Sequence, residues 1–569
     1  MILPLRLLLA LATALSIPFI SAPANLHWLH WFAFLPLFAA LDGLSLRRGL
    51  LLSYAMGWVA NLVIFWWLIE TVQRFSSLPW VAALAVHLLA TTAFSLSYTL
   101  FGVMPWLRQR LGAWWILAMP VVVVAGEQAF PVLFPYYQGV SQYRQAAMFQ
   151  LASVTGVVGL SFLIVLVNAV LYEAALALRA RRRPPLAALG ITAALIAANL
   201  AFGTWRHAAV EAELAQAPVL RVSILQQAVT MEQRLRESPW EGFFEWTRLT
   251  AEVADQAPDL VVWPEGAISF NPNEDRAFST LRKKSLGRLA DKLSQVGGMD
   301  LAGMPPELKS LPGDNPLVLD SLAGHSVKTL FEAFAEQGGY DLLIGGGTIE
   351  ENPDPQPGQP EYIAHNSLYV FDEQGSIEAR YDKMVPLPFG EYIPLSDTFP
   401  FLKEIVQGPG DFQAGTDPVF FEVATADGQP LRYTTPICYE AILQPTMRRL
   451  AGGGAPETTA DFFVNITNDA WFGDTASPHQ HAMLTAVQTV QVGRPMLRIA
   501  YTGISWIVEP HGDIRHETRP FTEEAMVAPL RVRRYETLYS RGGWLFGWFN
   551  VVGAVGFIVW GRRRGPVAA

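Results

Sequence analysis

The sequence of 569 residues holds one cysteine, Cys438, so no intramolecular disulfide can form and the fold cannot depend on oxidation. Charged residues are also scarce, at 16%, where soluble domains usually hold about 25%. Neither CxxC nor HExxH occurs, and we predict no metal and no cofactor. The net charge of -9 gives no sign of nucleic-acid binding. The chain is 51% hydrophobic, which predicts a membrane protein with a sizeable soluble part.

Long apolar runs fill the first third of the chain. A membrane-spanning helix needs ~20 mostly apolar residues. Seven candidates precede residue 206, near 4–22, 28–46, 50–70, 79–105, 112–127, 150–177 and 185–204, and an eighth lies near 544–560. The first resembles a signal peptide, but the six further candidates before residue 206 favour a retained helix. We therefore predict a seven-span membrane domain over 1–206, and a final membrane helix with a tail over 541–569.

Arginines in the short loops predict the orientation. They follow every even-numbered span and are scarcer after the odd ones: Arg47, Arg48, Arg108, Arg110, Arg179, Arg181, Arg182, Arg183, Arg562, Arg563 and Arg564. Cytoplasmic loops carry such an excess. Both termini are therefore expected in the cytoplasm, and the long polar segment on the other side, which is the periplasm for a bacterial inner-membrane protein. Intramembrane charge is too scarce to favour a transporter.

Residues 207–540 read as a layered α/β domain with a mixed sheet, because strand-like and helix-like segments alternate and turn to hairpins. The expected strands are 219–226, 259–263, 341–345, 365–372, 376–381, 462–466, 499–509 and 526–532, and the expected helices are 240–257 and 478–492. The glycines of 345–348 lack both GK[ST] and GxGxxG, so they predict a tight turn at a strand end. Residues 282–339, rich in Lys, Gly, Pro and Ser, are expected to be an inserted surface subdomain or lid.

Three short motifs bring complementary chemistry to this domain. A lone cysteine is more often a small buried hydrophobe than a nucleophile. However, a strand-like approach over 431–437 and a helix-like stretch over 441–450 flank Cys438, which would present it at the rim of a sheet. Glu265 follows a buried strand and Lys383 follows the hairpin. A carboxylate can take the thiol proton, and an ammonium can stabilise an oxyanion, so the three residue types suit acyl transfer.

The motifs WPEG with Glu265, YDK with Lys383 and ICYE with Cys438 resemble the Glu-Lys-Cys triad of the nitrilase (carbon–nitrogen hydrolase) superfamily. The stretches KMVPLPFGEYIP (383–394) and NITNDAWFGDTASPHQ (465–480), with GRP at 493–495, resemble the apolipoprotein N-acyltransferases. The resemblance implies an α-β-β-α domain. It also implies transfer of a fatty acyl chain from a phospholipid, through a cysteine thioester, to the α-amine of a diacylglyceryl-cysteine lipoprotein.

Roles for single residues follow from the same resemblance. Cys438 would be the nucleophile, Glu265 the general base and Lys383 the stabiliser of the oxyanion. Glu391 matches a second glutamate that orients Lys383 or the amine. Tyr439 and Glu440 match residues that line the substrate pocket. Of the aromatic residues in the surrounding loops, Phe389 and Trp471 are expected to cover the acyl chain or dip into the membrane surface, with plain packing as the alternative.

Several positions depart from the family pattern. The separation between Glu265 and Lys383 is long because of the segment 282–339. Leu235 stands where tryptophan is common, Gln488 and Gln491 where an arginine and a glutamate are common, and Tyr501 near a usual asparagine. These departures leave acyl and headgroup preference open.

Three other functions compete with acyl transfer to an amine. The same triad could serve a membrane-anchored amidase that uses water as acceptor. A catalytically silent scaffold that binds lipoproteins is a second alternative, against which the intact triad argues, and a transporter is a third. A monomer is expected, because no repeat or coiled coil is present.

Overall fold

The computed structural model describes residues 1–76, 78–130, 132–234, 239–268, 326–352, 361–394, 396, 398–399, 412–452 and 456–565. Leu235 and most of the segment 282–339 therefore lie outside the described residues. The described end of that segment forms helix α16 (Val327–Gly338), which begins with a capping box between Ser326 and Thr329.

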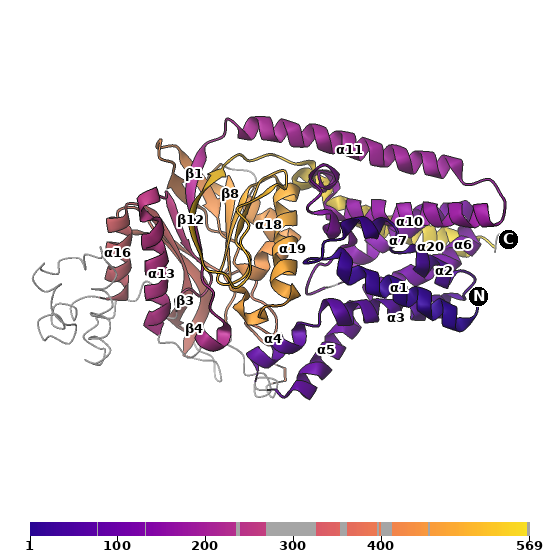
Figure 1. Ribbon diagram of the computed structural model, residues 1–569, viewed down its shortest axis with the longest axis horizontal. Coiled ribbons are helices and arrows are strands. Elements are labelled where there is room, and N and C mark those ends of the chain that lie inside the picture. Colours follow the sequence, from indigo (N-terminus) through magenta and orange to yellow (C-terminus); the bar gives the residue numbers. More distant parts are fainter. Residues whose placement is uncertain are drawn as a thin grey trace, which may run out of the picture.

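The chain before residue 215 is helical (Figure 1). Its α-helices are α1 (Leu3–Ile20), α2 (Leu35–Leu41), α3 (Leu46–Ile64), α4 (Leu68–Phe75), α5 (Trp80–Phe94), α6 (Met104–Leu111), α7 (Trp115–Ala129), α8 (Ala146–Phe149), α9 (Ala152–Thr155), α10 (Val157–Arg179) and α11 (Leu186–Leu214). Short 3₁₀ helices η1 (His27–Trp31), η2 (Ser97–Val103), η3 (Gly112–Trp114) and η4 (Gln138–Gln142) connect some of them. Near the end of the chain, the turn η11 (Tyr539–Gly543) leads into α20 (Leu545–Arg563).

Fewer helices than expected are long and apolar enough to cross a membrane. Among the described residues there are five, Leu3–Ile20, Ser97–Ala129, Val157–Arg179, Leu186–Leu214 and Tyr539–Arg563, or six if the bent pair α3 and α4 counts as one span. The prediction of eight is therefore not confirmed. The run 28–46 breaks into η1 and α2, and the run 79–105 ends its α-helix at Phe94, so each leaves a helix too short to span.

Two six-stranded sheets follow the helices. The first has the order β12-β1-β2-β3-β4-β5 and the second β11-β10-β9-β8-β7-β6. The strands are β1 (Val219–Gln226), β2 (Leu260–Trp263), β3 (Asp341–Glu351), β4 (Tyr362–Phe371), β5 (Ile377–Asp382), β6 (Phe421–Ala424), β7 (Pro430–Thr434), β8 (Phe462–Thr467), β9 (Met496–Ala500), β10 (Trp506–Val508), β11 (Ile514–Arg515) and β12 (Glu524–Arg531). In each sheet three parallel strands lie at the centre, β1-β2-β3 and β7-β8-β9, and antiparallel strands lie at the edges.

Alternating side chains explain how the sheets pack. Along β2, Leu260 and Val262 belong to the core that joins the two sheets, and Val261 and Trp263 face the opposite side. There they pack with α13 (Pro239–Val253) and α16. Helices α18 (Gln444–Ala451) and α19 (Ala476–Val492) cover the second sheet (Figure 1). The predicted α-β-β-α layering is confirmed.

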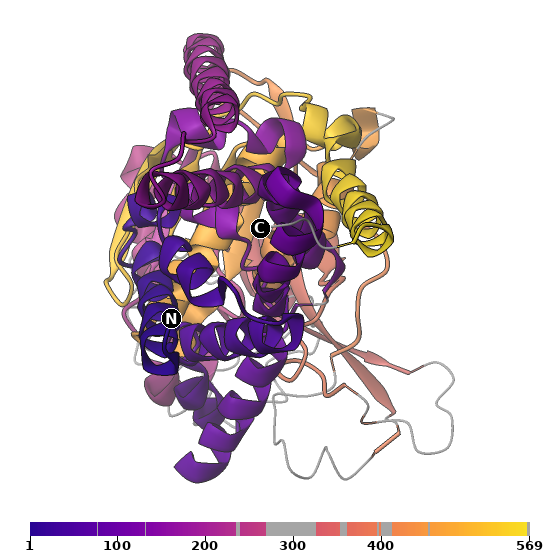
Figure 2. The same cartoon turned by 90° about the vertical axis from the view of Figure 1, so that its right-hand side faces the viewer.

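Helix α19 lies between the second sheet and the membrane-type helices (Figure 1). Its side chains from Ser477 to Val492 are buried, apart from the partly exposed His479, which is typical of a helix with packing partners on all sides. Helix α11 lies by contrast at the margin of the helical part, at the top of both views (Figures 1 and 2). It continues to Leu214, and β1 begins at Val219.

Two local predictions were wrong. The expected strand 499–509 is two strands, β9 and β10, which pair antiparallel because the chain turns back at residues 501–505. The expected tight turn at 345–348 lies inside the long strand β3. Packing requires a glycine at position 345, because a Cβ there would lie 2.3 Å from the carbonyl oxygen of Pro264 and 2.8 Å from the Cα of Glu265.

Candidate active site

Cys438 lies at a sharp turn after a strand, as the sequence predicts. Strand β7 ends at Thr434, and the 3₁₀ helix η8 (Cys438–Ile442) leads into α18. The φ angle of Cys438 is +50°, in the left-handed region that side chains rarely adopt. The residue is 7% exposed. Such a turn holds the side chain in one direction at the carboxyl end of the sheet.

Glu265 follows β2 of the other sheet and is held from three directions. Its Oε1 lies 3.3 Å from Nζ of Lys383 and accepts a hydrogen bond from Asn366 Nδ2 at 2.7 Å. Its Oε2 accepts from the backbone N–H of Asn468 at 2.8 Å. Since β2, β4, β5 and β8 supply these residues or directly precede them, the two sheets together build this side of the site.

Lys383 is buried between two carboxylates. Besides Glu265, its Nζ contacts Oε2 of Glu391 at 2.7 Å, and Lys383 is 1% exposed. Glu391 also accepts hydrogen bonds from Asn366 at 2.5 Å and from the Leu387 N–H at 2.6 Å. Burial alone would lower the pKa of the Lys383 ammonium, but the charges of Glu265 and Glu391 raise it well above its usual value. Lys383 therefore carries a fixed positive charge.

The thiol of Cys438 is held in its neutral form. Burial raises its pKa, the negative charge of Glu265 raises it further, and the positive charge of Lys383 opposes both. Thiolate is the reactive form of cysteine, so a neutral thiol needs a base that takes its proton as it attacks. Glu265 is a carboxylate close enough to influence the Cys438 pKa, and both residues line one cavity.

Glu440 lies beneath the site and lines neither of the two cavities at Cys438 that the described residues form. It is fully buried and accepts hydrogen bonds from the Tyr381 hydroxyl at 2.9 Å and from the N–H groups of Ile437 at 2.7 Å, Met384 at 2.7 Å and Val385 at 3.1 Å. Burial raises the pKa of Glu440 to about 7, although these hydrogen bonds act to lower it. Glu440 thus ties the turn at Cys438 to the segment after Lys383.

A second buried network supports the backbone of Cys438. His481 of α19 lies with Nε2 3.4 Å from the Cys438 carbonyl oxygen and with Nδ1 2.8 Å from Asp469. Asp469 in turn pairs with Arg498 at 2.8 Å. Burial favours the neutral carboxyl, but Arg498 and His481 hold the pKa of Asp469 below its usual value.

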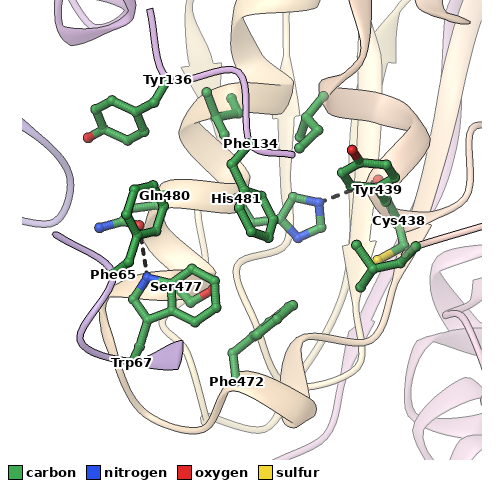
Figure 3. Close-up of a pocket in the computed structure, with 13 residues that line it drawn as sticks. Phe65, Trp67, Phe134, Tyr136, Cys438, Tyr439, Phe472, Ser477, Gln480 and His481 are labelled. Atoms are coloured by element: carbon green, nitrogen blue, oxygen red, sulfur yellow. Dashed lines mark hydrogen bonds between the residues drawn. The ribbon is translucent and has the colours of Figure 1, made fainter. Parts of the chain in front are cut away.

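Two cavities meet at Cys438. One, the charged cavity, contains the charged groups of Glu265, Lys383 and Glu391 beside apolar side chains. It reaches Trp471, which stacks on Phe75 of α4 with ring centroids 4.4 Å apart. The other, the apolar cavity, is lined by Phe65, Trp67, Phe134, Tyr136, Leu387, Cys438, Tyr439, Ile442, Phe472, Ser477, Gln480, His481 and Leu484 (Figure 3). The thiol therefore faces charged groups on one side and aromatic rings from the helical part on the other.

The remaining predicted pocket residues, Tyr439, Phe389 and Trp471, lie in three different places. Tyr439 lines the apolar cavity, and its hydroxyl donates a hydrogen bond to the Leu133 carbonyl at 2.7 Å. Phe389 is 57% exposed and lines neither cavity. It has φ +64° and leaves its ring free of the site. Trp471 lines the charged cavity and not the apolar one.

Sequence analysis did not predict several residues of the site. Asn366 sits in the middle of a hairpin strand, where an asparagine gives no signal. Phe65, Trp67 and Phe134 come from the helical part, where aromatic residues are expected as packing or interfacial groups. Asn468 and His481 lie in or beside the quoted stretch 465–480, which could have pointed to them.

The departures from the family pattern have structural partners. Gln491 accepts a hydrogen bond from the Val157 N–H at 2.8 Å and donates one to Gln488 at 2.8 Å. Gln491 thus joins α19 to the start of α10, and Gln488 bonds to its side chain. Tyr501 accepts a hydrogen bond from Arg234 at 2.5 Å and packs edge-on against Trp246.

Two protein families match this chain. Residues 10–170 match the apolipoprotein N-acyltransferase N-terminal domain, and residues 221–538 match the carbon-nitrogen hydrolase family. The apolipoprotein N-acyltransferase of Geobacter metallireducens is 28% identical over 92% of this chain and 89% of its own length. That of Brucella melitensis is 28% identical over 84% of this chain and 79% of its own length. Among solved structures, an amidase from Nesterenkonia sp. AN1 has a TM-score of 0.32, with 15% identity over 55% of this chain and 91% of that one. The chain therefore belongs to the carbon–nitrogen hydrolase family, in its apolipoprotein N-acyltransferase branch.

Proposed function

We propose that this enzyme moves a fatty acyl chain from a phospholipid onto Cys438 and then onto the N-terminal α-amine of a diacylglyceryl-cysteine lipoprotein. Lipoprotein N-acylation is the activity of its family branch. The donor, the thioester and the roles of single residues are the new part of the proposal. The observation that carries it is the position of Cys438, which is shared by a charged cavity and an apolar one.

In the first half-reaction, Glu265 takes the thiol proton as the sulfur attacks the ester carbonyl of the phospholipid. Lys383 stabilises the negative charge that forms on the carbonyl oxygen. The intermediate collapses when the C–O bond to the glycerol breaks, and Glu265 returns the proton to that oxygen. A lysophospholipid leaves, and the acyl chain stays on Cys438 as a thioester.

In the second half-reaction, the α-amine of the lipoprotein attacks the thioester carbonyl. Glu265 takes a proton from the amine, and the oxyanion again forms beside Lys383. The C–S bond breaks, the amide leaves, and the sulfur regains its proton from Glu265. Glu391 acts through Lys383, because its carboxylate is one of the two charges that keep the buried ammonium protonated.

The two cavities suit the two parts of a lipid. We assign the acyl chain to the apolar cavity, which is lined by aromatic rings of the helical part and by α19. The ester, the headgroup and then the incoming amine occupy the charged cavity, whose mouth Phe75 and Trp471 border. Burial of acyl carbons contributes about 0.8 kcal/mol per CH₂, so an apolar cavity next to the thiol favours a long-chain donor over water-soluble esters.

The setting of the enzyme follows from the same features. We infer a bacterial inner-membrane protein with a membrane domain over 1–206, a periplasmic catalytic domain over 207–540 and a final helix with a tail over 541–569. The arginine pattern supports cytoplasmic termini. Helix α1 starts and α20 ends at the edge of the helical part away from the sheets (Figure 1), which supports a topology with both ends on the same side of the membrane. We infer that the enzyme acts as a monomer.

A single-turnover experiment tests this function. Purified enzyme is mixed with phospholipid and no acceptor, and intact-mass spectrometry should find one hydroxylamine-labile acyl group on the chain. Cys438→Ala should carry none and should not acylate a diacylated lipopeptide, and Cys438→Ser should have little or no activity. An unmodified wild-type chain, or lipopeptide acylation by Cys438→Ala at the wild-type rate, contradicts the proposal. Rapid loss of the acyl group to water would instead favour the amidase.

A further inference from the structure

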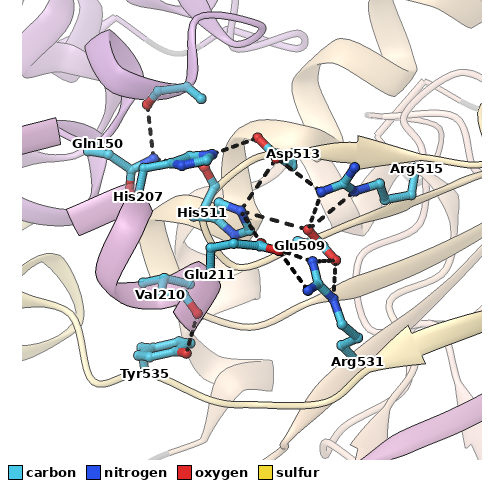
Figure 4. Close-up of polar contacts among 11 residues, drawn as sticks. Gln150, His207, Val210, Glu211, Glu509, His511, Asp513, Arg515, Arg531 and Tyr535 are labelled. Atoms are coloured by element: carbon cyan, nitrogen blue, oxygen red, sulfur yellow. Dashed lines mark hydrogen bonds and ion pairs between the residues drawn. The ribbon is translucent and has the colours of Figure 1, made fainter. Parts of the chain in front are cut away.

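A second polar cluster lies where α11 meets the hairpin of β10 and β11 (Figure 4). His207 and Glu211 stand four residues apart on α11, so both point from one face of the helix. Glu509, His511 and Asp513 alternate along the hairpin. Among the described residues, every group of His, Cys, Asp and Glu with ligand atoms close enough to hold an ion includes His511.

His511 is the centre of this cluster. It is fully buried, and neither of its ring nitrogens makes a hydrogen bond of acceptable geometry. Its Nε2 lies 3.3 Å from Glu211 Oε2, 3.7 Å from Glu509 Oε2 and 3.5 Å from Asp513 Oδ2. A buried imidazole without a hydrogen bond is costly, by about 1–3 kcal/mol. The ring nitrogen is therefore aimed at a group of oxygens without bonding to any of them well, as expected if a cation belongs between them.

Two arginines already satisfy part of the negative charge. Arg531 pairs with both oxygens of Glu211, at 2.9 Å and 3.0 Å, and also contacts Glu509. Arg515 lies 3.5 Å from Glu509 and 3.3 Å from Asp513. With neutral histidines, three carboxylates face two guanidinium groups, so one negative charge remains.

We propose that His207, His511 and Asp513 bind a zinc ion, with water in the fourth position. Their ligand atoms all lie within 4.8 Å of one another, and His207 Nε2 is 3.0 Å from Asp513 Oδ1. Zinc bonds to nitrogen and oxygen are about 2.0–2.1 Å long, which puts neighbouring tetrahedral ligands about 3.3 Å apart. His207 Nε2 lies 3.0 Å from Oδ1 of Asp513, and His511 Nε2 lies 3.5 Å from its Oδ2. The two imidazoles therefore face the two oxygens of one carboxylate at separations on either side of that value. Side chains of His207 and Asp513 are 29% and 28% exposed, so an ion can enter from solvent.

Such a site would fasten α11 to the catalytic domain. Few residues of this 29-residue helix are buried: Thr192, Asn199, Gly203, Val210 and Leu214. The zinc would join the last turns of α11, a helix that begins in the membrane part, to a hairpin 306 residues later in the chain. That distance explains why no sequence motif signals it. A structural metal also stabilises the folded state by the free energy of its binding.

The test measures zinc on the full-length enzyme in detergent. The protein is stripped with a chelator, reloaded with Zn²⁺, desalted and analysed by mass spectrometry of the metal. Wild type should retain about one zinc per chain, and zinc should raise its Tm. His207→Ala should bind zinc at least about tenfold more weakly and lose the Tm shift. The matched control is His516→Asn on the same hairpin, an exposed histidine whose φ of +52° suits asparagine.

Two results overturn the proposal. One is a wild type that retains no stoichiometric zinc, and the other is equal zinc retention by His207→Ala. Either result would leave the cluster as a network of arginine, histidine and carboxylate groups only. If His207→Ala does not fold, X-ray absorption of zinc-loaded wild type decides: two imidazole ligands at about 2.0 Å support the site, and a spectrum without imidazole excludes it.

Discussion

Lys383 and Glu391 form a buried ion pair, with Nζ 2.7 Å from Oε2 and both residues less than a tenth exposed. A buried pair of charges is costly to build and more costly to break, because the partner left behind has no compensation. In the proposed mechanism the pair has a catalytic consequence. The positive charge that would stabilise the oxyanion exists in the protein interior because Glu265 and Glu391 hold it there.

Glu391→Gln should therefore slow acylation of Cys438 by roughly a hundredfold, the range seen when an oxyanion stabiliser is weakened. The amide can still accept the hydrogen bond from the Leu387 N–H, so the local fold should survive. The measurement is the single-turnover rate of acyl-enzyme formation by mass spectrometry. Glu422→Gln, at an exposed glutamate of β6, is the control and should react like wild type. An unchanged acylation rate in Glu391→Gln would remove this residue from the mechanism.

The raised pKa of the Cys438 thiol predicts how the resting enzyme reacts with iodoacetamide. Thiolate is the species that is alkylated, and a group with a raised pKa loses its proton only at higher pH. The alkylation rate should therefore climb steadily with pH from 6 to 9 without a plateau. Because the chain has one cysteine, the adduct mass reports this site alone, and Cys438→Ser is the blank. A plateau near neutral pH would indicate a preformed thiolate–ammonium pair with Lys383.

Glu440→Gln should destabilise the enzyme and lower its activity together. All four partners of Glu440 are donors, three backbone N–H groups and the Tyr381 hydroxyl. A glutamine must turn its own N–H₂ toward at least one of them, which leaves donors unpaired in the interior at about 1–3 kcal/mol each. Thermal unfolding should show a lower Tm, while Glu336→Gln, at an exposed position of α16, should not. Equal Tm values would mean that Glu440 is not the acceptor the structure shows.

Local sequence predicted most of what depends on one segment. Strand β1 matches its predicted bounds. The motif residues Glu265 and Lys383 lie two residues and one residue beyond strand ends, respectively, at the edge where β7 presents Cys438. What depends on distant segments was not predicted. Asn366 bridges Glu265 and Glu391 from the middle of β4, and Phe65 and Phe134 reach the thiol's cavity from the helical part. Neither relation leaves a pattern in its own neighbourhood.

The number of spans shows the same limit. Hydropathy alone made 28–46 and 79–105 look like whole spans, since it measures composition and not where a helix stops. A third candidate, 50–70, is interrupted as well. Its residues 65–67 leave the helix, and α3 and α4 meet there at an angle of 58°. This break lets Trp67 turn toward α19, where its indole N–H donates to Gln480 at 3.1 Å (Figure 3). The break is thus matched by a packing partner more than 400 residues away, which hydropathy cannot detect.

Filling the apolar cavity should change which acyl chains are used. Leu484 of α19 lines that cavity and is 5% exposed. Leu484→Phe adds volume, so the last carbons of a palmitoyl chain should lose their place, while an octanoyl chain should still fit. We expect the ratio of palmitoyl to octanoyl transfer to fall roughly tenfold, in the range that one or two methylenes are worth in a hydrophobic pocket. Comparing two donors on one variant removes any general effect of the substitution on folding. Leu484→Met, which nearly conserves volume, should keep the wild-type ratio. A ratio that stays at the wild-type value in Leu484→Phe would mean that the acyl chain lies elsewhere, and the charged cavity beside Phe75 and Trp471 would then have to hold it.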